Sequence, residues 1–223
     1  MSPLILAVDT THEYGSLALA RGGETLEEVL LHAPTGFAHV IYDHLERLLA
    51  RHAVSLDAID CFAAASGPGS FTGVRVGLAC IKGLAEALGK PAVAISNLEA
   101  IAAFGSARLR VAVLDARRGE IYAAVYDEAG RPRSPEVVTK LAPWLQTLEE
   151  EVEFVSPDPA WLATALAGTR FEGARVVEAP RALAARLACL AATRLLRGEA
   201  GDPAALDANY VRRSDAELFW KEG

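Results

Sequence analysis

Apolar runs separated by turn residues predict a mixed α/β arrangement in the first half of the chain. Residues 4–8, 16–20 and 26–31 are short apolar or alternating runs with glycines between them, a pattern typical of strands joined by hairpins. The elements that follow are predicted as helix, strand, helix, strand and helix, at residues 34–51, 58–65, 72–88, 92–95 and 96–105. The first half therefore predicts the order βββαβαβα.

The same order recurs from residue 110, and this repeat is the strongest architectural signal in the sequence. Three strands are predicted at residues 110–115, directly after the turn at Gly119, and at residues 136–139. The next helices and strands alternate at residues 143–149, 152–155, 159–167, 175–177 and 180–197. Two βββαβαβα halves indicate a duplicated α/β protein with domains at residues 1–105 and 106–223. We expect three aromatic residues of the tail to pack back on the body: Tyr210, Phe219 and Trp220.

A glycine-rich turn runs straight into a long apolar helix at residues 66–88. Its glycines reach backbone angles that other residues avoid, so we expect a sharply shaped turn that another part of the backbone approaches closely. Ser70 or Thr72 is expected to cap the helix, and Gly89 to end it. The glycines of the turn are Gly67, Gly69 and Gly73.

One face of this helix carries small and apolar residues at spacings of three and four. Such a face lets another helix approach closely. The spacing leaves two interpretations open, a helix buried within its own domain or a partner surface, and by itself it favours the buried helix. The residues of this face are Gly73, Gly77, Cys80, Ile81 and Leu84.

Composition and charge describe an ordinary folded chain of 223 residues, 52% hydrophobic and 23% charged. The longest uncharged run, residues 61–74, is broken by glycine and proline, and no leader pattern is present, so we expect a soluble cytoplasmic protein without a membrane partner. Three distant cysteines favour buried thiols over disulfides or a metal site. A net charge of −7 disfavours independent contact with a phosphate backbone, so nucleic acid is expected to be held through a partner.

Four of the five histidines lie within one short segment, which raises the question of a metal site. No pair of them is separated by three residues, and one predicted helix places two of them on different faces. We interpret them as surface or partly buried structural residues. They are His32, His39, His44 and His52.

Five stretches together resemble the TsaB family, formerly called YeaZ. They are ILAVDTT, SGPGSFTGVRVGLACIKGLA, ISNLEAIA, VLDARRGEIYAAVYD and YVRRSDA, and the likeness covers nearly the whole chain. The resemblance implies the actin, sugar-kinase and Hsp70 superfold, built from two βββαβαβα domains. It also implies a role in making N6-threonylcarbamoyladenosine in tRNA. In that role the subunit binds its paralogue TsaD, which transfers the threonylcarbamoyl group, and the ATPase TsaE joins them.

The resemblance further implies that TsaB and TsaD meet through the helices at residues 37–51 and 72–88. The same surface predicts a homodimer when TsaD is absent, because two copies can bury one patch about a two-fold axis. Transfer RNA is then contacted only through the complex. The residues implied in partner binding are Val40, His44, Gly73, Gly77, Cys80, Ile81 and Leu84.

TsaD-like proteins carry a His-x-x-x-His metal motif after the glycine turn, and the matching positions here hold Asn97 and Ile101. An amide and an aliphatic side chain cannot replace two imidazoles on a divalent metal, so we expect no metal site. Glu99 is better explained by its spacing from Ser96, which fits a capping box.

The first hairpin matches the place where this superfold contacts phosphate, but no lysine lies nearby to neutralise it. The glycine turn has neither a P-loop lysine nor a dinucleotide fingerprint. We interpret the two segments as a vestigial phosphate loop and expect no cofactor, with ATP at the interface of the complex left open. The loop residues are Asp9, Thr10, Thr11, Gly67 and Gly69.

The sequence therefore favours a non-catalytic subunit of the tRNA threonylcarbamoyladenosine synthase. An independent ATP-binding phosphotransferase of the same fold is the alternative. A glycoprotease-like hydrolase is a third reading, with a triad of Ser70, His39 and Asp9, but Ser70 lacks a Gly-x-Ser-x-Gly setting.

Overall fold

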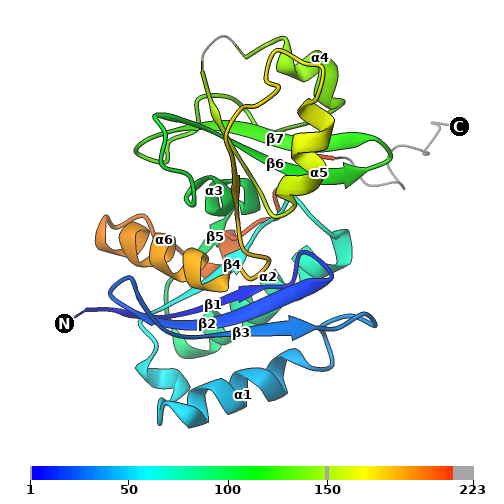
Figure 1. The fold of residues 1–223 in the computed structure, drawn as a ribbon. Coiled ribbons are helices and arrows are strands. Elements are labelled where there is room, and N and C mark those ends of the chain that lie inside the picture. The colour runs from blue at the N-terminus through cyan, green and yellow to red at the C-terminus, as the bar shows by residue number, and fades with distance from the viewer. Residues whose placement is uncertain (1, 149–150, 213–223) are drawn as a thin grey trace, which may run out of the picture. The chain divides into compact units, whose positions relative to one another are not determined.

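The computed structural model describes residues 2–148 and 151–212, and these residues pack into two compact units (Figure 1). Of the described residues, the first unit contains 2–97 and 181–209, and the second contains 98–148, 151–180 and 210–212. Within the described ranges, no helix has the length and apolar character needed to cross a membrane.

The sheet of the first unit has the strand order β3-β2-β1-β4-β5. The first three strands form antiparallel hairpins, and β4 and β5 add parallel to β1. This arrangement brings the carboxyl ends of β1 and β4 to the same edge of the sheet. The strands are β1 Leu4–Asp9, β2 Tyr14–Arg21, β3 Glu24–His32, β4 Cys61–Ala65 and β5 Ala92–Ile95.

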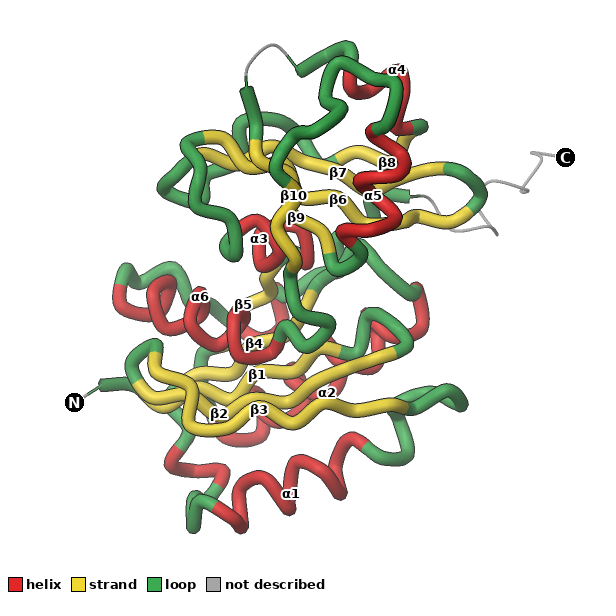
Figure 2. Tube along the Cα trace, viewed as in Figure 1, coloured by secondary structure: helices red, strands yellow, loops and turns green. Residues whose placement is uncertain are grey.

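Helices cover both faces of this sheet (Figures 1 and 2). Alternate residues of β1 (Leu4, Leu6 and Val8) share one buried apolar cluster with α1 and α2, as the two-residue period of a strand requires. The opposite face is covered by α6, which contacts β1, β2 and β4. The helices are α1 Ile41–Arg51, α2 Phe71–Leu88 and α6 Ala184–Leu196, with short turns η1 Leu56–Ala58 and η2 Pro203–Ala205.

Side chains of the N-terminal strands cap α6, which explains why this late helix belongs to the first unit. The hydroxyl of Ser16 accepts the N–H groups of Leu183 and Ala184 at 3.1 and 2.9 Å, and Glu28 accepts the N–H of Ala185. These bonds satisfy the free donors of the first turn. The predicted division at residue 105 follows the sequence repeat and stays a prediction, while packing returns residues 181–209 to the first unit.

The second unit repeats the architecture with the strand order β10-β9-β6-β7-β8. Residues of α4 and α5 share a buried cluster with β6, β7 and β9. The elements are β6 Leu109–Arg117, β7 Glu120–Asp127, β8 Val137–Thr139, α4 Leu141–Leu145, β9 Glu153–Ser156, α5 Pro159–Leu166 and β10 Val176–Glu178, preceded by α3 Asn97–Ala102. The predicted repeat and the α/β class are therefore confirmed.

Several predicted boundaries differ from the structure, among them those of α1 and α4. The helix predicted from residue 34 begins at Ile41, because Gly36 adopts a φ of +102° and residues 37–40 form a turn whose Phe37 still packs into the core. The helix predicted at residues 143–149 is α4, which begins two residues earlier. Glu149 lies outside the described residues.

The C-terminal tail returns to the first unit as far as residue 209. Leu206 and Ala208 pack against its apolar cluster, and the N–H of Asn209 donates to the carbonyl of Ser66 in the glycine turn. Tyr210 is 45% exposed. Phe219 and Trp220, which we expected to pack on the body, lie outside the described residues.

Candidate functional site

The end of β1 and the glycine turn are joined by a buried network of polar side chains. The backbone N–H and the hydroxyl of Thr11 both donate to Oδ1 of Asp9, at 2.9 and 2.6 Å. Nδ2 of Asn97 donates to the hydroxyl of Thr11 at 2.6 Å, and its Oδ1 accepts the N–H of Gly67 at 3.0 Å. Asp9, Thr11 and Asn97 are fully buried, so Asn97 links the predicted phosphate loop to the glycine turn.

Glycines allow this close packing between α2 and the loop after β1. A Cβ atom on Gly73 would lie 2.0 Å from the carbonyl oxygen of Thr10, and one on Gly69 would lie 2.5 Å from that of Thr11. Thr10 also donates its hydroxyl to the carbonyl of Gly73 at 2.7 Å. The close approach expected at the glycine turn is therefore made by the chain's own first loop.

The predicted caps of α2 are confirmed. The hydroxyl of Ser70, rather than Thr72, accepts the N–H of Gly73 at 3.3 Å. Gly89 ends the helix with a φ of +60°, in the left-handed region.

A cavity of about 340 Å³ lies beside this network, within the first unit. Its polar lining comes from hydroxyls and imidazoles, and Glu13 adds one carboxylate. Its apolar lining comes mainly from the segment 33–38. The polar residues are Thr10, His12, Glu13, Thr35, His39, Ser70 and Thr72. A space of this size is at the lower limit for small-molecule sites.

The hydrolase triad is not assembled. Ser70 and His39 both line the cavity, but the hydroxyl of Ser70 caps α2, and the imidazole of His39 lies 3.4 Å from the hydroxyl of Thr35. Oδ1 of Asp9 accepts hydrogen bonds from Thr11. Oδ2 of Asp9 is buried without a hydrogen-bond partner among the described residues. Among the described residues, no hydrogen bond joins Ser70, His39 and Asp9 to one another, so the triad is not formed.

The clustered histidines make separate local contacts. His32 stacks on Tyr14 with ring centroids 4.7 Å apart, and His52 lies 2.7 Å from the carboxylate of Glu27. Burial and these contacts agree with the structural role that we inferred from their spacing. Across residues 2–148 and 151–212, no three His, Cys, Asp or Glu side chains gather as they would around a metal ion. At the position of the TsaD-like metal motif, Asn97 bonds as described above and Ile101 is fully buried.

Packing within the first unit accounts for the small residues of α2. Four of these residues lie on the covered side of the helix: Gly73, Gly77, Cys80 and Ile81. Cys80 and Ile81 are at most 2% exposed, and a Cβ on Gly77 would lie 2.6 Å from the hydroxyl oxygen of Thr10. Packing inside the first unit explains their small size, and the partner-binding role that the resemblance implies for them stays a prediction. The other implied residues, Val40, His44 and Leu84, are half-buried.

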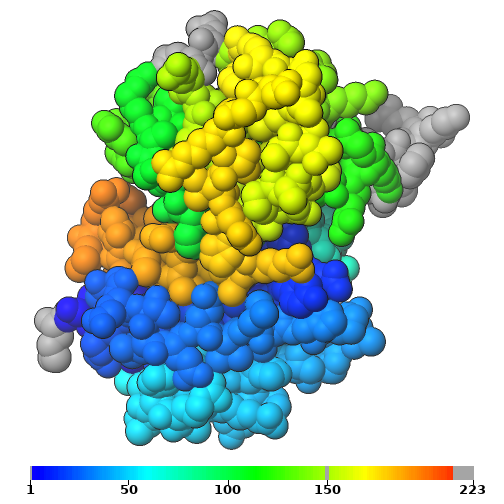
Figure 3. Space-filling view, in the orientation of Figure 1, coloured from blue at the N-terminus to red at the C-terminus, as the bar shows by residue number. Residues whose placement is uncertain are grey.

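The outer side of α1 and α2 presents a different set of residues. Tyr42 is 57% exposed and Phe71 is 39% exposed, and both belong to the small group of exposed large apolar residues in the described chain. The guanidinium of Arg75 lies 3.7 Å from the centre of the Phe71 ring. Further along the same helix, α2 exposes two small residues, Ala79 and Gly83. In the space-filling view, the blue-to-cyan atoms of the α1 region lie at the surface of the first unit (Figure 3).

A hydrogen bond between the exposed Tyr42 and the buried Cys80 joins the two helices. The thiol of Cys80 is hydrogen-bonded to Tyr42, and burial raises the pKa of Cys80 to about 11. Burial also raises the pKa of Cys61 to about 12. Both thiols stay protonated at neutral pH and are poor nucleophiles or metal ligands.

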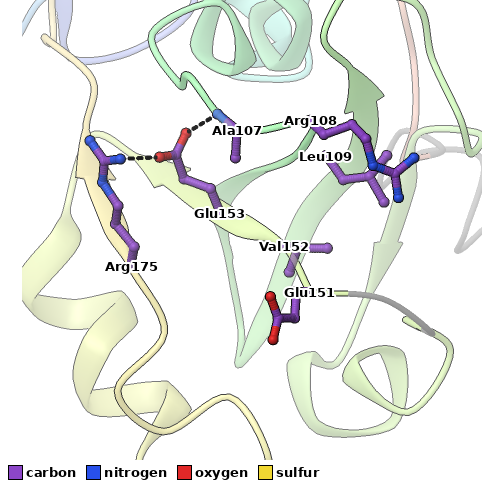
Figure 4. A pocket seen from close by; sticks show the side chains of 7 residues that line it. All are labelled: Ala107, Arg108, Leu109, Glu151, Val152, Glu153 and Arg175. Carbon is purple, nitrogen blue, oxygen red and sulfur yellow. Dashed lines mark hydrogen bonds and ion pairs between the residues drawn. The ribbon is translucent and has the colours of Figure 1, made fainter.

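A second cavity, of about 610 Å³, lies in the second unit where β6, β9 and β10 begin (Figure 4). Its wall is built around Glu153, a buried carboxylate that accepts the N–H groups of Ser106 and Ala107 and pairs with Arg175 at 3.1 Å. Arg108 and Glu151 lie further along the lining. The Glu153 carboxylate is satisfied within the unit, so it holds the segment entering β6 against β9.

Sequence reasoning missed the exposed aromatic residues and the linking role of Asn97. Tyr42 and Phe71 are aromatic residues on helix faces that otherwise carry polar residues, and this pattern can be recognised in the sequence. Thr11, the hydrogen-bond partner of Asn97, lies 86 residues away in the chain, so no local sequence pattern predicts this contact.

Comparison with known proteins places these features in a family. The family model of TsaD, described as tRNA N6-adenosine threonylcarbamoyltransferase, matches residues 32–193. The chain is 30% identical to the tRNA threonylcarbamoyladenosine biosynthesis protein TsaB of Bacillus subtilis, over 98% of both proteins.

Solved structures give the same result. YeaZ from Pseudomonas aeruginosa superposes with a TM-score of 0.77 at 27% identity, covering 93% of this chain and 99% of that one. Component A of (R)-2-hydroxyglutaryl-CoA dehydratase from Acidaminococcus fermentans has a TM-score of 0.56 at 10% identity, covering 87% of this chain and 100% of that one, a likeness of fold alone. The expected actin-like superfold is thereby confirmed.

Proposed function

This chain belongs to the TsaB (YeaZ) family of tRNA threonylcarbamoyladenosine biosynthesis proteins, and on that basis we propose that it is a non-catalytic subunit of the synthase. It binds the TsaD catalytic subunit and supports its active shape, and TsaE completes the complex. The match of the TsaD family model to residues 32–193 supports descent from a common ancestor with that partner.

The observation that carries the non-catalytic part is that hydroxyl and amide side chains of the loop after β1 and of the glycine turn bond to one another as structural links. Thr10, Thr11, Ser70 and Asn97 each bond to another part of the same network. A nucleophile needs an adjacent base and an open approach. Here the groups instead fix the glycine turn against β1, which gives α2 a rigid position.

The outer side of α1 and α2 is the surface that we assign to TsaD. Thr72, Val76, Ala79, Gly83 and Ala87 follow one another at spacings of four, three, four and four along α2, which is the seam pattern of packed helices. A Cβ on Gly83 would meet no atom within 4 Å, so this part of the seam has room for a partner's side chain. The exposed rings of Tyr42 and Phe71 are of the type that anchors protein interfaces.

Reconstitution tests the proposal. Purified TsaD, TsaE, tRNA, ATP with Mg²⁺ and a threonylcarbamoyl donor are combined with and without this chain, and modified adenosine is measured by mass spectrometry. We expect product only when the chain is present, and none from the chain without TsaD. Equal product with and without the chain would reject the proposal.

An independent phosphotransferase is the second candidate, and one observation favours it. The cavity of about 340 Å³ adjoins the loop after β1, where Asp9 keeps one buried oxygen without a partner among the described residues. Calorimetric titration of the isolated chain with ATP and Mg²⁺ separates the two candidate functions: we expect no saturable binding and no hydrolysis.

Elemental analysis of protein purified without chelator is expected to show no stoichiometric zinc or iron, since Asn97 and Ile101 replace the motif's histidines.

A further inference from the structure

The side chain of Tyr42 is exposed along most of its length and fixed at its hydroxyl. Tyr42 and Cys80 are hydrogen-bonded to each other through their side chains. Tyr42 is 57% exposed, whereas Cys80 is 2% exposed. The hydroxyl is therefore held by a buried group of α2 while much of the tyrosine stays at the surface of α1.

The neighbours of both residues lie in one core, which keeps the two helices together at this point. Ile41 and Ile81 are at most 1% exposed, and they share a buried apolar cluster with Cys80. Tyr42 is the second residue of α1, and Cys80 lies in the middle of α2. The bond between hydroxyl and thiol thus belongs to a junction that is otherwise apolar.

Cys80 also lies next to the seam of α2. Ala79, which directly precedes it, is exposed and belongs to the seam that we assign to TsaD. At 2% exposure, Cys80 offers a partner almost no surface of its own. Its bond to Tyr42 instead holds an exposed tyrosine beside the middle of the seam.

A side chain that is held before binding is a better anchor than one that moves freely. An exposed tyrosine samples several rotamers, and an interface that immobilises it has to offset the lost conformational entropy. A fixed hydroxyl removes part of that loss in advance. Cysteine suits the buried position, because its thiol packs as a small apolar group and can still accept a weak hydrogen bond.

We infer that Cys80 is a positioning residue for partner binding: it orients the side chain of Tyr42 on the outer side of α1 and α2, where the ring contacts TsaD. The partner-binding role that the resemblance implies for Cys80 is then exercised through Tyr42, without exposure of the thiol. The inference rests on the proposed function, which supplies TsaD as the partner.

A double-mutant cycle on the affinity for TsaD tests the inference. Tyr42→Phe removes the hydroxyl and keeps the ring, and Cys80→Ala removes the thiol. Cys61→Ala is the matched control, because Cys61 is a fully buried cysteine of the same unit whose thiol donates to the carbonyl of Phe62. Calorimetric titration of the full chain with purified TsaD gives the dissociation constant, and urea denaturation followed by circular dichroism checks the folding of each variant.

We expect each single variant to bind TsaD about fivefold more weakly than wild type. The double variant should also be about fivefold weaker, rather than about twenty-five-fold, because the second substitution has no bond left to remove. Cys61→Ala should bind TsaD as wild type does. A purely structural role of Cys80 would lower stability without this dependence on the Tyr42 hydroxyl.

Additive losses in the double variant would overturn the inference, since they would show two independent effects. Wild-type affinity of Cys80→Ala beside a weakened Tyr42→Phe would do the same, because the hydroxyl would then act without the thiol. An equal loss in Cys61→Ala would trace the effect to general destabilisation. If Cys80→Ala does not fold, wild-type affinity of Tyr42→Phe alone overturns the inference and a fivefold loss supports it. Failure of the wild-type chain to bind TsaD rejects the proposed function itself, a result that needs no variant.

Discussion

The side-chain amide of Asn97 donates to the hydroxyl of Thr11 at 2.6 Å, across 86 residues of sequence. The same amide accepts the N–H of Gly67, so one side chain ties the loop after β1 to the glycine turn. Both contacts are fully buried and unavailable to water. Asn97 thus occupies the position of a metal ligand in the resembling motif and works as a hydrogen-bonded link.

Replacing Asn97 by alanine should lower the free energy of unfolding by about 2 to 4 kcal/mol, because it leaves the N–H of Gly67 and the Thr11 hydroxyl without a partner. Urea denaturation followed by circular dichroism measures the loss. Asn97→Asp is the comparison: it keeps an acceptor for Gly67 but loses the donor to Thr11 and adds a buried negative charge, so we expect it to destabilise as well. A wild-type midpoint for Asn97→Ala would show that the link contributes no stability.

Two glycines of α2 should respond in opposite directions to alanine. Gly77→Ala should destabilise by about 2 kcal/mol, since its Cβ would lie 2.6 Å from the hydroxyl oxygen of Thr10, and Gly77→Leu should unfold the protein. Gly83→Ala should stabilise by about 0.5 to 1 kcal/mol, because its Cβ meets nothing and alanine favours helix. Thermal melts of both variants decide this. If Gly77→Leu folds like wild type, the assignment of this side of α2 to the core is wrong.

A charge on the outer side of α2 should break partner binding without unfolding the chain. Ala79→Glu places a carboxylate in the middle of the exposed seam, where an interface would have to desolvate it. We expect a wild-type circular dichroism spectrum, conversion of any homodimer to monomer in ultracentrifugation, and at least tenfold weaker TsaD binding, a factor that corresponds to about 1.4 kcal/mol. Ala163→Glu, an exposed alanine on α5, is the control. Unchanged TsaD affinity for Ala79→Glu would place the interface elsewhere.

The buried thiols should make stability fall in alkaline solution. Burial raises the pKa of Cys61 to about 12 and that of Cys80 to about 11, from 9.0 when unfolded. Since the folded values are the higher ones, the stabilisation is complete below pH 9 and is lost as the pH rises through 9 toward the folded values. Between pH 8 and pH 10, each thiol should lower the free energy of unfolding by about 1 kcal/mol. The difference in urea midpoints between wild type and Cys61→Ala, Cys80→Ala should shrink over this range, and parallel curves would contradict the assignment.

Several elements were predictable because their signal is local. The strand runs, the Ser70 cap and the left-handed Gly89 each follow from neighbouring residues, and the structure confirms them. The start of α1 was not predictable in the same way. Phe37 repeats at helical spacing with the residues of α1, yet it reaches the core from a turn that Gly36 permits. Periodicity reports which side chains are buried, and a turn can bury a side chain as well as a helix can.

The sequence by itself determined the duplicated βββαβαβα order, the α/β class and the family, because periodicity and motifs depend on residues that are close together in the chain. Only the tertiary structure decided which side of α2 is covered. Gly73 and Gly77 look alike as core glycines or as interface glycines. The difference lies in Thr10, more than sixty residues earlier, whose carbonyl lies against Gly73 and whose hydroxyl lies against Gly77. The same holds for α6, which belongs to the first unit because Ser16 and Glu28 cap it. Contacts between distant residues follow from chain closure in three dimensions, and no local pattern encodes them.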